Sequence, residues 1–518
     1  MSEPGEREIN ARLRRVDWRF LLPTPRPQRA LCRAGAGLAQ AVASIAGEVV
    51  TAGAAGDCDL AVAEDPDPLL LAELRDALRP GGACYTEWHL PVVGTQRVER
   101  ALRTAGFTDV TCYRPWPASA ELPVYWIPLG APGAASYVRS RRRLRGGRTR
   151  RLLAGAHQWV RDLVRGQYAS PICAIARRPG ASPSGGVDPA AWLREGWSAW
   201  GLGPAPERLS TLLVTGGPRS VSKVVLLAFA EPNPTPLVAV KAPRVDEAAA
   251  GVRREGAALA SLAGDRGRPV PGVPRILFLR EIDGLPLVGE TALAGRPLES
   301  LLASRSLRGW SLKVADWLAT LADGSPVVPA GHWRETIVEP VLCRFVELFG
   351  RVADRGLLRE CEGIVRAIGA LPRVSEQRDF GPWNVLVTSA GELAVLDWES
   401  AEVDGLPVLD LLYYLTHASF NVDRAHDTDT RLASYHRSLD PSTRTGAVRR
   451  DCLARYLDAL GLEETAMAPL RVLLWLIHAP SEFRHAAADA GGPPPAGVLE
   501  RSLFLALWQQ EVRDVAGR

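Results

Sequence analysis

Three polar residues in the C-terminal half of the chain combine a potential proton acceptor with oxygen ligands for a metal. Asp379 and Asn384 have the spacing D-x-x-x-x-N in the segment QRDFGPWNVL, and Asp397 follows in LDWE. A hydroxyl nucleophile must be oriented and can lose its proton to a carboxylate, whereas Mg²⁺ prefers oxygen ligands. The apolar residues 385–387 and 393–396 can pair as a hairpin that brings Asp397 to the same metal site. Such an arrangement is typical of phosphoryl transfer.

The same segment resembles the catalytic segment of aminoglycoside phosphotransferases and their choline-kinase-like relatives. That family reads roughly H-x-D-x-x-x-x-N, followed by an apolar strand pair and a D-W-E-like tripeptide. The likeness covers about residues 205–485. The resemblance implies that Asp379 is the catalytic base, that Asn384 and Asp397 bind Mg²⁺, and that ATP is the phosphoryl donor.

Two further positions bear on this resemblance. The segment GLPVLDL at residues 405–411 matches the family's G-x-P-x-x-D-L, so Asp410 is expected to fix the catalytic loop. Gln377 stands where the family has a histidine that mainly gives hydrogen-bonding support, and we expect glutamine to replace that support. This difference motivates an alternative reading of the protein as a pseudoenzyme scaffold that binds nucleotide without turnover.

A lysine at the end of an apolar strand is the expected phosphate ligand. Lys241 ends the segment LVAVK, and a cationic side chain inside a strand must face either solvent or an anion. The resemblance implies that this lysine holds the α- and β-phosphates and pairs with a glutamate on a helix. Glu255, in the predicted helix 247–262, is the preferred partner, and Glu247 is the second choice.

A glycine-containing turn between two predicted strands matches the position of the loop that covers the nucleotide. Residues 215–220 read TGGPRS, and glycines there would let backbone amides approach phosphate groups. The candidate contacts are Gly216, Gly217 and the hydroxyl group of Ser220 or Ser222. A plain hairpin explains the same turn about as well.

The segment that follows the predicted helix resembles the adenine-contacting hinge of the family. Residues 287–291 are extended and precede the GRPL segment at 295–298. Glu290 and Ala292 are therefore expected to offer backbone groups to the base.

The acceptor pocket of the family lies among its C-terminal helices, so lining residues are sought there. The candidates share a polar side chain in an apolar helical setting, and they are Tyr413, His417, His478, Glu482 and Arg484. A lone histidine on an apolar helix is more often a core residue than a ligand-binding one.

Residues 26–178 resemble a class I S-adenosylmethionine-dependent methyltransferase domain. The likeness rests on four segments, ALCRAGAG at 30–37, DLAVA at 59–63, LRPGG at 78–82 and RTAGFTDV at 103–110. Strand and helix signals alternate through this region, which predicts an α/β sheet with helical crossovers.

The methyltransferase resemblance fails where the cofactor would bind. Arg33 or Ala34 stands where an acidic residue is expected before the glycines, and the stretch between Gly37 and Gly81 leaves little room for the second strand. We therefore expect a degenerate Rossmann-like domain. The alternative is an active methyltransferase that binds S-adenosylmethionine, which would make the protein bifunctional.

An arginine-rich segment lies between Arg139 and Arg165, with Asp162 as its only acidic residue. Apolar residues interleave with the arginines, which suggests a helix pair lying on an anionic membrane surface. A solvated helical insertion between two strands, at about 137–166, explains the pattern as well. Nucleic acid is the least favoured partner because aromatic stacking groups are sparse.

The bulk properties fit a multidomain globular protein. The chain has 518 residues and a net charge of +4, which by itself implies no polyanionic partner. Its eight cysteines form no C-x-x-C pair and are expected to be reduced. The first residues contain no apolar signal-peptide core, and no run of about 18 apolar residues occurs, so a cytoplasmic protein is expected.

The Pro-, Gly- and Ser-rich residues 179–188 are the predicted linker between two domains. Residues 1–178 are expected to form the Rossmann-like α/β domain, and 189–518 a kinase-like α+β domain. Within the latter, a β-rich small lobe is expected at about 205–292 and a helical large lobe at about 293–518.

The favoured function is ATP-dependent transfer of the γ-phosphoryl group to a hydroxyl of a small molecule, such as a sugar, aminocyclitol or specialised metabolite. A peptide or lipid-linked acceptor near a membrane is an alternative, motivated by the arginine-rich segment. The sequence leaves the identity of the acceptor and the oligomeric state open.

Overall fold

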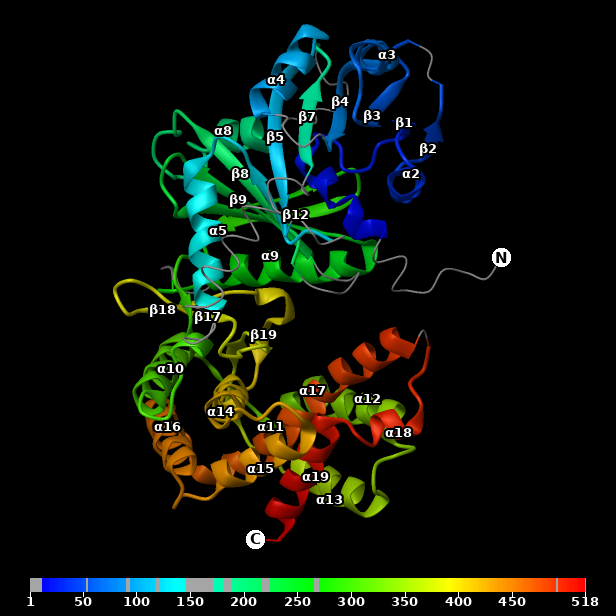
Figure 1. Ribbon diagram of the computed structural model, residues 1–518. Coiled ribbons are helices and arrows are strands. Elements are labelled where there is room, and N and C mark those ends of the chain that lie inside the picture. The colour runs from blue at the N-terminus through cyan, green and yellow to red at the C-terminus, as the bar shows by residue number, and fades with distance from the viewer. Residues whose placement is uncertain are drawn as a thin grey trace. The chain divides into compact units, whose positions relative to one another are not determined.

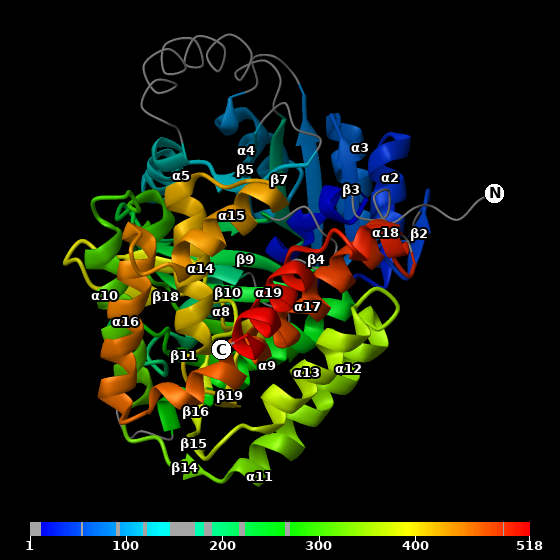
Figure 2. The same ribbon diagram turned by 90° about the horizontal axis from the view of Figure 1, so that it is seen from below.

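The computed structural model describes residues 12–52, 55–89, 94–117, 122–145, 171–180, 189–216, 223–264, 270–490 and 492–517. The chain divides into two compact units. Unit 1 comprises residues 1–256 and 275–293, and unit 2 comprises residues 257–274 and 294–518. Figure 1 labels their helices and strands, and Figure 2 gives the view from below.

The first part of unit 1 is a parallel sheet with helical crossovers. Its strands pair in the order β2-β1-β3-β4, and every one of these pairs is parallel. The chain adds β2 on one side of β1 and β3 on the other, which is the strand-order reversal of doubly wound sheets. The elements are β1 (Arg29–Arg33), α2 (Ala36–Ala43), β2 (Glu48–Val50), β3 (Cys58–Glu64), α3 (Pro68–Ala77) and β4 (Leu78–Trp88).

Local sequence explains why these elements form. α3 begins after Asp67, whose side chain accepts a hydrogen bond from the Leu70 N–H at 2.8 Å, and Pro68 occupies the first turn, where its missing N–H costs nothing. Residues 58–63 of β3 are all buried, as expected for a parallel strand that is covered on both faces.

The sheet continues from the parallel part into the predicted small lobe. β7 lies antiparallel between β4 and β5, and β6 pairs with both β5 and β8. Among the described residues, twelve strands form one sheet in the order β11-β12-β10-β9-β8-β6-β5-β7-β4-β3-β1-β2. The added strands are β5 (Thr108–Trp116), β6 (Tyr125–Pro128), β7 (Ile172–Arg177), β8 (Leu209–Val214), β9 (Lys223–Ala230), β10 (Pro236–Pro243), β11 (Ile276–Ile282) and β12 (Leu285–Thr291).

The helices of this part of unit 1 complete its α/β character. α9 begins in unit 1 and continues into unit 2, and its buried residues Val252, Glu255, Leu259 and Leu262 recur at the three- and four-residue spacing of one helix face. Its other helices are α4 (Thr95–Thr104), α5 (Pro132–Arg145) and α8 (Pro189–Gly196), and α9 spans Ala249–Gly264.

The 3₁₀ helix Asp17–Leu21 ties the two parts of the unit 1 sheet together. Trp18 stacks on Tyr85 of β4 with ring centroids 3.7 Å apart. Asp17 accepts two hydrogen bonds from Arg244, directly after β10, at 2.9 and 3.0 Å, and both side chains are fully buried. Such a paired geometry is needed to offset the cost of removing two charges from water.

Unit 2 is mainly helical. α10 (Leu307–Ala322) and α16 (Arg444–Leu460) lie side by side (Figures 1 and 2), and α17 (Met467–Ala490) packs against α12, α13 and α19. Residues 409–416 at the start of α14 are all buried, which marks a central helix. The further helices are α11 (Ala330–Trp333), α12 (Glu339–Phe349), α13 (Arg355–Arg366), α14 (Leu409–Asp423), α15 (Thr428–Leu439), α18 (Ala496–Leu499) and α19 (Leu503–Ala516).

Short strands connect these helices. β13 pairs with β17 and β17 with β18, whereas β14 pairs with β15 and β16 with β19, all antiparallel. The strands are β13 (Arg296–Pro297), β14 (Val327–Val328), β15 (Leu371–Pro372), β16 (Val374–Glu376), β17 (Val385–Val387), β18 (Leu393–Val395) and β19 (Glu402–Gly405).

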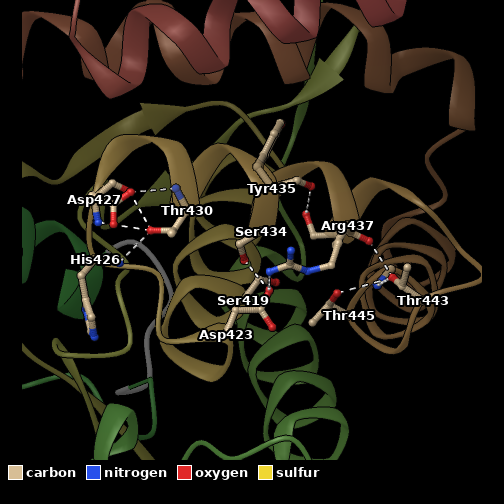
Figure 3. Close-up of polar contacts among 12 residues, drawn as sticks. Ser419, Asp423, His426, Asp427, Thr430, Ser434, Tyr435, Arg437, Thr443 and Thr445 are labelled. Atoms are coloured by element: carbon tan, nitrogen blue, oxygen red, sulfur yellow. Dashed lines mark hydrogen bonds and ion pairs between the residues drawn. The ribbon is translucent and has the colours of Figure 1, made fainter.

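Polar side chains fix the corner between α14 and α15 (Figure 3). The Asp423 carboxylate accepts hydrogen bonds from the Ser434 hydroxyl and the Arg437 guanidinium, both at 2.7 Å. α15 then begins with a capping box in which the Asp427 side chain accepts from the Thr430 N–H at 2.9 Å. This corner holds the C-terminal end of α14, the helix that carries two of the five candidate acceptor residues, Tyr413 and His417.

Many predicted elements coincide with observed ones. The predicted strand that ends at Lys241 falls within β10, the helix predicted at 247–262 overlaps α9, and the hairpin predicted from residues 385–387 and 393–396 is β17–β18. β1, β6 and β11 were not predicted from the sequence. The second strand, for which the sequence leaves little room, exists but has only the three residues of β2.

Several expectations concern residues outside the described ranges. Residues 181–188 of the predicted linker and 146–165 of the arginine-rich segment belong to them, so the domain boundaries stay a prediction.

All eight cysteines have free thiols, and only Cys343 is exposed. Within the described ranges, no helix is both long and apolar enough to cross a membrane.

We predict that Asp17→Asn lowers the free energy of unfolding by about 3–5 kcal/mol, because it leaves the Arg244 charge buried without its carboxylate. Thermal and urea unfolding measure the effect. The control is Glu281→Gln, which removes an exposed partner of Arg253 and should cost less than about 1 kcal/mol. Equal effects of the two substitutions would contradict the structural role of the buried pair.

Candidate active site

Lys241 lies in a buried cluster of opposite charges in unit 1. Its ammonium group forms ion pairs with Glu255 of α9 and with Glu290 of β12, the latter at 2.7 Å. Lys223 of β9 also reaches Glu255, at 2.9 Å. Burial opposes ionisation of Glu255, but the two lysines lower its pKa to about 2. The structure therefore joins Lys241 to the preferred partner, whereas the second choice, Glu247, is exposed in the 3₁₀ turn Asp246–Ala248.

The two predicted hinge residues, Glu290 and Ala292, make contacts within the unit 1 sheet. Glu290 lies in the interior of the sheet, opposite Ala239 on one side and Ile276 on the other, and its carboxylate contacts Lys241. Its backbone is thus part of the strand ladder and not available as a hinge contact. The Ala292 N–H donates to the Leu237 carbonyl at 2.9 Å, so this donor is also engaged within the sheet.

The loop predicted to cover the nucleotide is only partly described. Gly216 follows Thr215, whose hydroxyl donates to the Pro123 carbonyl at 2.6 Å and whose carbonyl accepts from Arg244 at 3.0 Å. The start of the loop is therefore anchored in unit 1. Gly217, Ser220 and Ser222 lie outside the described residues.

In unit 2, the β17–β18 hairpin brings the three polar residues of the catalytic motif together. The Leu396 N–H donates to the Asn384 carbonyl at 2.8 Å, so Asp397 follows directly beside Asn384. The Asn384 amide donates to the Asp379 carbonyl at 2.9 Å and to its carboxylate at 2.8 Å. Asp397 has φ = 67°, a left-handed conformation that aspartate tolerates better than most residues.

These residues fit a Mg²⁺ ion by the chemistry of their donors. Asn384 and Asp397 offer an amide and a carboxylate oxygen, which are ligands that Mg²⁺ prefers. Among the described residues, no group of three or more His, Cys, Asp and Glu side chains could hold a metal. Mg²⁺ at Asn384 and Asp397 would complete its coordination with nucleotide phosphates and water, as is usual for this ion.

Gln377 supplies the support expected at the position of the family histidine. Its amide group donates to the Leu396 carbonyl at 3.0 Å and to the Asp397 carbonyl at 2.5 Å, and its side-chain oxygen accepts from the Asp379 N–H at 2.9 Å. The side chain is fully buried. One glutamine thus joins the loop that carries Asp379 to the segment that carries Asp397.

Asp410 holds the same loop from the other side. Its buried carboxylate accepts hydrogen bonds from the backbone N–H of Gln377 at 2.6 Å and of Arg378 at 2.9 Å. Burial and the neighbouring Glu376 carboxylate raise the pKa of Asp410 to about 7, and the two N–H donors act in the opposite direction. This is the fixing role that the sequence predicts for Asp410.

The electrostatic environment of Asp379 favours a carboxylate that can accept a proton. Burial and the nearby Asp397 carboxylate raise the pKa of Asp379 to about 6, although hydrogen bonds from Trp383, Asn384 and Tyr413 lower it. The Tyr413 hydroxyl donates to the carboxylate at 3.4 Å. Asp379 therefore stays largely ionised near neutral pH, while its affinity for a proton exceeds that of an exposed aspartate.

Aromatic residues surround Asp379 on the side of α14 and α17. Tyr413 stacks on His478 with centroids 4.3 Å apart, and His417 lies 4.4 Å from Tyr413 and 4.9 Å from Trp383. Burial lowers the pKa of both histidines to about 3, so they are neutral at physiological pH. Trp383 was not predicted from the sequence, although it lies within the catalytic motif.

The other two acceptor candidates, Glu482 and Arg484, have different surroundings in unit 2. The Glu482 carboxylate accepts from the Phe504 N–H at 2.9 Å and from the Ser502 hydroxyl, so it supports the start of α19. Arg484 is exposed. Of the five candidates, Tyr413, His417 and His478 therefore form one cluster near Asp379.

Trp383 is the exposed member of this aromatic cluster. Its side chain is 38% exposed, whereas Tyr413 is buried. The indole folds over Gly381, where an added Cβ atom would lie 2.3 Å from the ring. Glycine at this position therefore lets the tryptophan lie against the loop that carries Asp379.

Comparison with known proteins gives distant structural matches. No protein-family model matches the sequence, and a search of curated proteins finds no match. One similar solved structure is a thermostable mutant of aminoglycoside phosphotransferase APH(4)-Ia, a ternary complex with ADP and hygromycin B. It is 14% identical, with a TM-score of 0.38, and the match covers 64% of this chain and 100% of that chain.

Two further similar structures are also of aminoglycoside phosphotransferases. The aminoglycoside phosphotransferase APH(3″)-Id from Streptomyces rimosus is 14% identical, with a TM-score of 0.32, over 55% of this chain and 98% of that chain. The streptomycin–ATP complex of APH(2″)-IIa is 13% identical, with a TM-score of 0.32, over 55% and 89%. Structural likeness at such low identity and TM-score assigns no function to this chain.

We predict that Gln377→Leu disorders the catalytic loop, because it leaves the Asp379 N–H and the carbonyls of Leu396 and Asp397 without their buried partner. Each unpaired group costs about 1–3 kcal/mol. Thermal unfolding and amide hydrogen exchange of residues 377–397 measure the loss. Gln377→Glu is a matched control that keeps the acceptor but loses the amide donor, so it should cause a smaller increase in exchange at the Asp379 N–H than the leucine variant.

Proposed function

We propose that the region of about residues 205–485 is an ATP-dependent phosphotransferase that acts on a hydroxyl group of a small molecule, such as a sugar, aminocyclitol or specialised metabolite. The observation that carries this proposal is the loop held by Gln377 and Asp410, from which Asp379 and Asn384 project beside Asp397. The charged pair of Lys241 and Glu255 supports it independently, because it supplies a phosphate-binding cation in a strand.

In this proposal Asp379 orients the acceptor hydroxyl and takes up its proton as the phosphoryl group is transferred. Tyr413 and Trp383 hold the carboxylate by hydrogen bonds and leave it beside an exposed indole. Mg²⁺, when bound, would neutralise phosphate charge, with Asn384 and Asp397 as its protein ligands. Lys241 would bind phosphate oxygens.

The geometry at Gln377 argues against the alternative of an inactive scaffold. That alternative was motivated by the missing histidine, and the glutamine makes hydrogen bonds on both sides of the catalytic loop. A peptide or lipid-linked acceptor near a membrane stays open, because most of the arginine-rich segment lies outside the described residues.

We propose further that residues 26–178 form a degenerate Rossmann-like domain. The supporting observation is the parallel order β2-β1-β3-β4 with its reversal at β1. At that point the Gly35 N–H donates to the Glu64 carboxylate at 2.7 Å. β2 ends at the apolar Val50, and its acidic residue, Glu48, lies at the start of the strand, away from the end where ribose hydroxyls would bind. Titration with S-adenosylmethionine tests this proposal, since tight binding would favour an active methyltransferase.

We predict that Asp379→Asn reduces turnover by at least about 100-fold and leaves ATP binding intact, because it removes the proton acceptor while keeping the side-chain shape. Asp397→Asn should instead weaken Mg²⁺-dependent nucleotide binding. A panel of hydroxyl acceptors, with products detected by mass spectrometry, measures turnover, and calorimetry measures binding.

The matched control is Asp404→Asn, which changes an exposed carboxylate of β19 that pairs with Arg373. It should leave turnover and binding unchanged. Wild-type turnover no faster than that of Asp379→Asn across all acceptors would reject the enzyme and favour the scaffold.

A further inference from the structure

Lys241 forms ion pairs with two buried carboxylates. Glu255 approaches it from α9 and Glu290 from β12, and the exposed fractions of the three residues are 6%, 0% and 2% for Lys241, Glu255 and Glu290. Glu255 is shared with Lys223. Glu290 is therefore an additional anion on the lysine that is expected to bind nucleotide phosphates.

The second oxygen of the Glu290 carboxylate lacks a hydrogen-bond donor among the described residues. Glu290 Oε2 is buried and has no hydrogen-bond partner among the described residues. A buried carboxylate oxygen without a donor is costly, and protonation or movement of the group relieves this cost. Burial, opposed by Lys241 and reinforced by Glu255, raises the pKa of Glu290 to about 7.

We propose that Glu290 occupies the position of a nucleotide phosphate on Lys241, and that phosphate binding displaces this carboxylate with uptake of one proton. The inference rests on the proposed nucleotide binding and adds a residue that controls it. A phosphate oxygen and the Glu290 carboxylate are both negatively charged, and both would pair with the ammonium group of Lys241. Protonated Glu290 can leave Lys241 to the phosphate and remain buried without a negative charge.

The charged groups that face Glu290 determine the sign of the pH effect. They are Lys241 of β10, Lys223 of β9 and Glu255 of α9, while the neighbouring strand β11 places the apolar Ile276 opposite Glu290. A bound phosphate adds negative charge and raises the proton affinity of Glu290 further. Nucleotide affinity should thus be highest below pH 7 and should fall by up to tenfold per pH unit above it.

The test is calorimetric titration of the full-length protein with Mg·ATP, in buffers of different ionisation enthalpy, from pH 6 to pH 8. The wild-type protein should take up close to one proton at pH 7.5 to 8. Glu290→Gln has nearly the same shape and no titratable group, so it should take up fewer protons. It should also bind Mg·ATP about tenfold more tightly than the wild type at pH 8, and with similar affinity at pH 6.

The control is Glu281→Gln, which removes an exposed carboxylate from β11 and should behave like the wild type. Equal proton uptake and equal affinity of the wild type and Glu290→Gln would overturn the inference and leave the proposed function standing. Absence of Mg·ATP binding by every variant would overturn both. Where Glu290→Gln fails to fold, proton uptake by the wild type decides alone, since a value near zero rejects the displacement.

Discussion

The buried carboxylate of Asp410 holds the backbone from which the candidate catalytic residues project. It accepts the N–H groups of Gln377 and Arg378, and Arg378 has φ = 63°, in the left-handed region. Such a conformation costs about 1–3 kcal/mol in a residue other than glycine. Each of the two hydrogen bonds contributes about 0.5–1.5 kcal/mol, and about 1.5–3 kcal/mol where the carboxylate is ionised, so Asp410 can stabilise this strained turn. Asp379 is the next residue, so the conformation of this turn determines where its backbone lies.

Much of this site could be predicted because its parts are close in sequence. The D-x-x-x-x-N spacing and the short hairpin determine where Asn384 and Asp397 meet, whatever the rest of the fold does. The Asp410 motif lies only a short distance further along the chain. Trp383 was missed because nothing in its sequence context shows that the indole stays exposed, which depends on the close approach to Gly381.

Features that depend on strand register or long-range pairing could not be predicted. Ala239 and Lys241 face the same side of β10, and Glu290 lies opposite Ala239, so the Glu290 side chain reaches Lys241 diagonally. A shift of one residue would turn Glu290 to the other face. Likewise, the four-residue strand β6 joins the two parts of the unit 1 sheet through partners on both sides of the predicted linker.

The charge balance around Lys241 explains why a second carboxylate is useful in a nucleotide-binding lobe. A buried lysine destabilises a protein unless an anion compensates its charge. Glu255 alone faces two lysines, and Glu290 brings these four side chains to neutrality. A nucleotide brings its own negative charge, so the cation that attracts phosphate is also the one that would destabilise the empty lobe. A carboxylate that can take up a proton resolves this conflict, because it is charged when the lobe is empty and neutral when phosphate is bound.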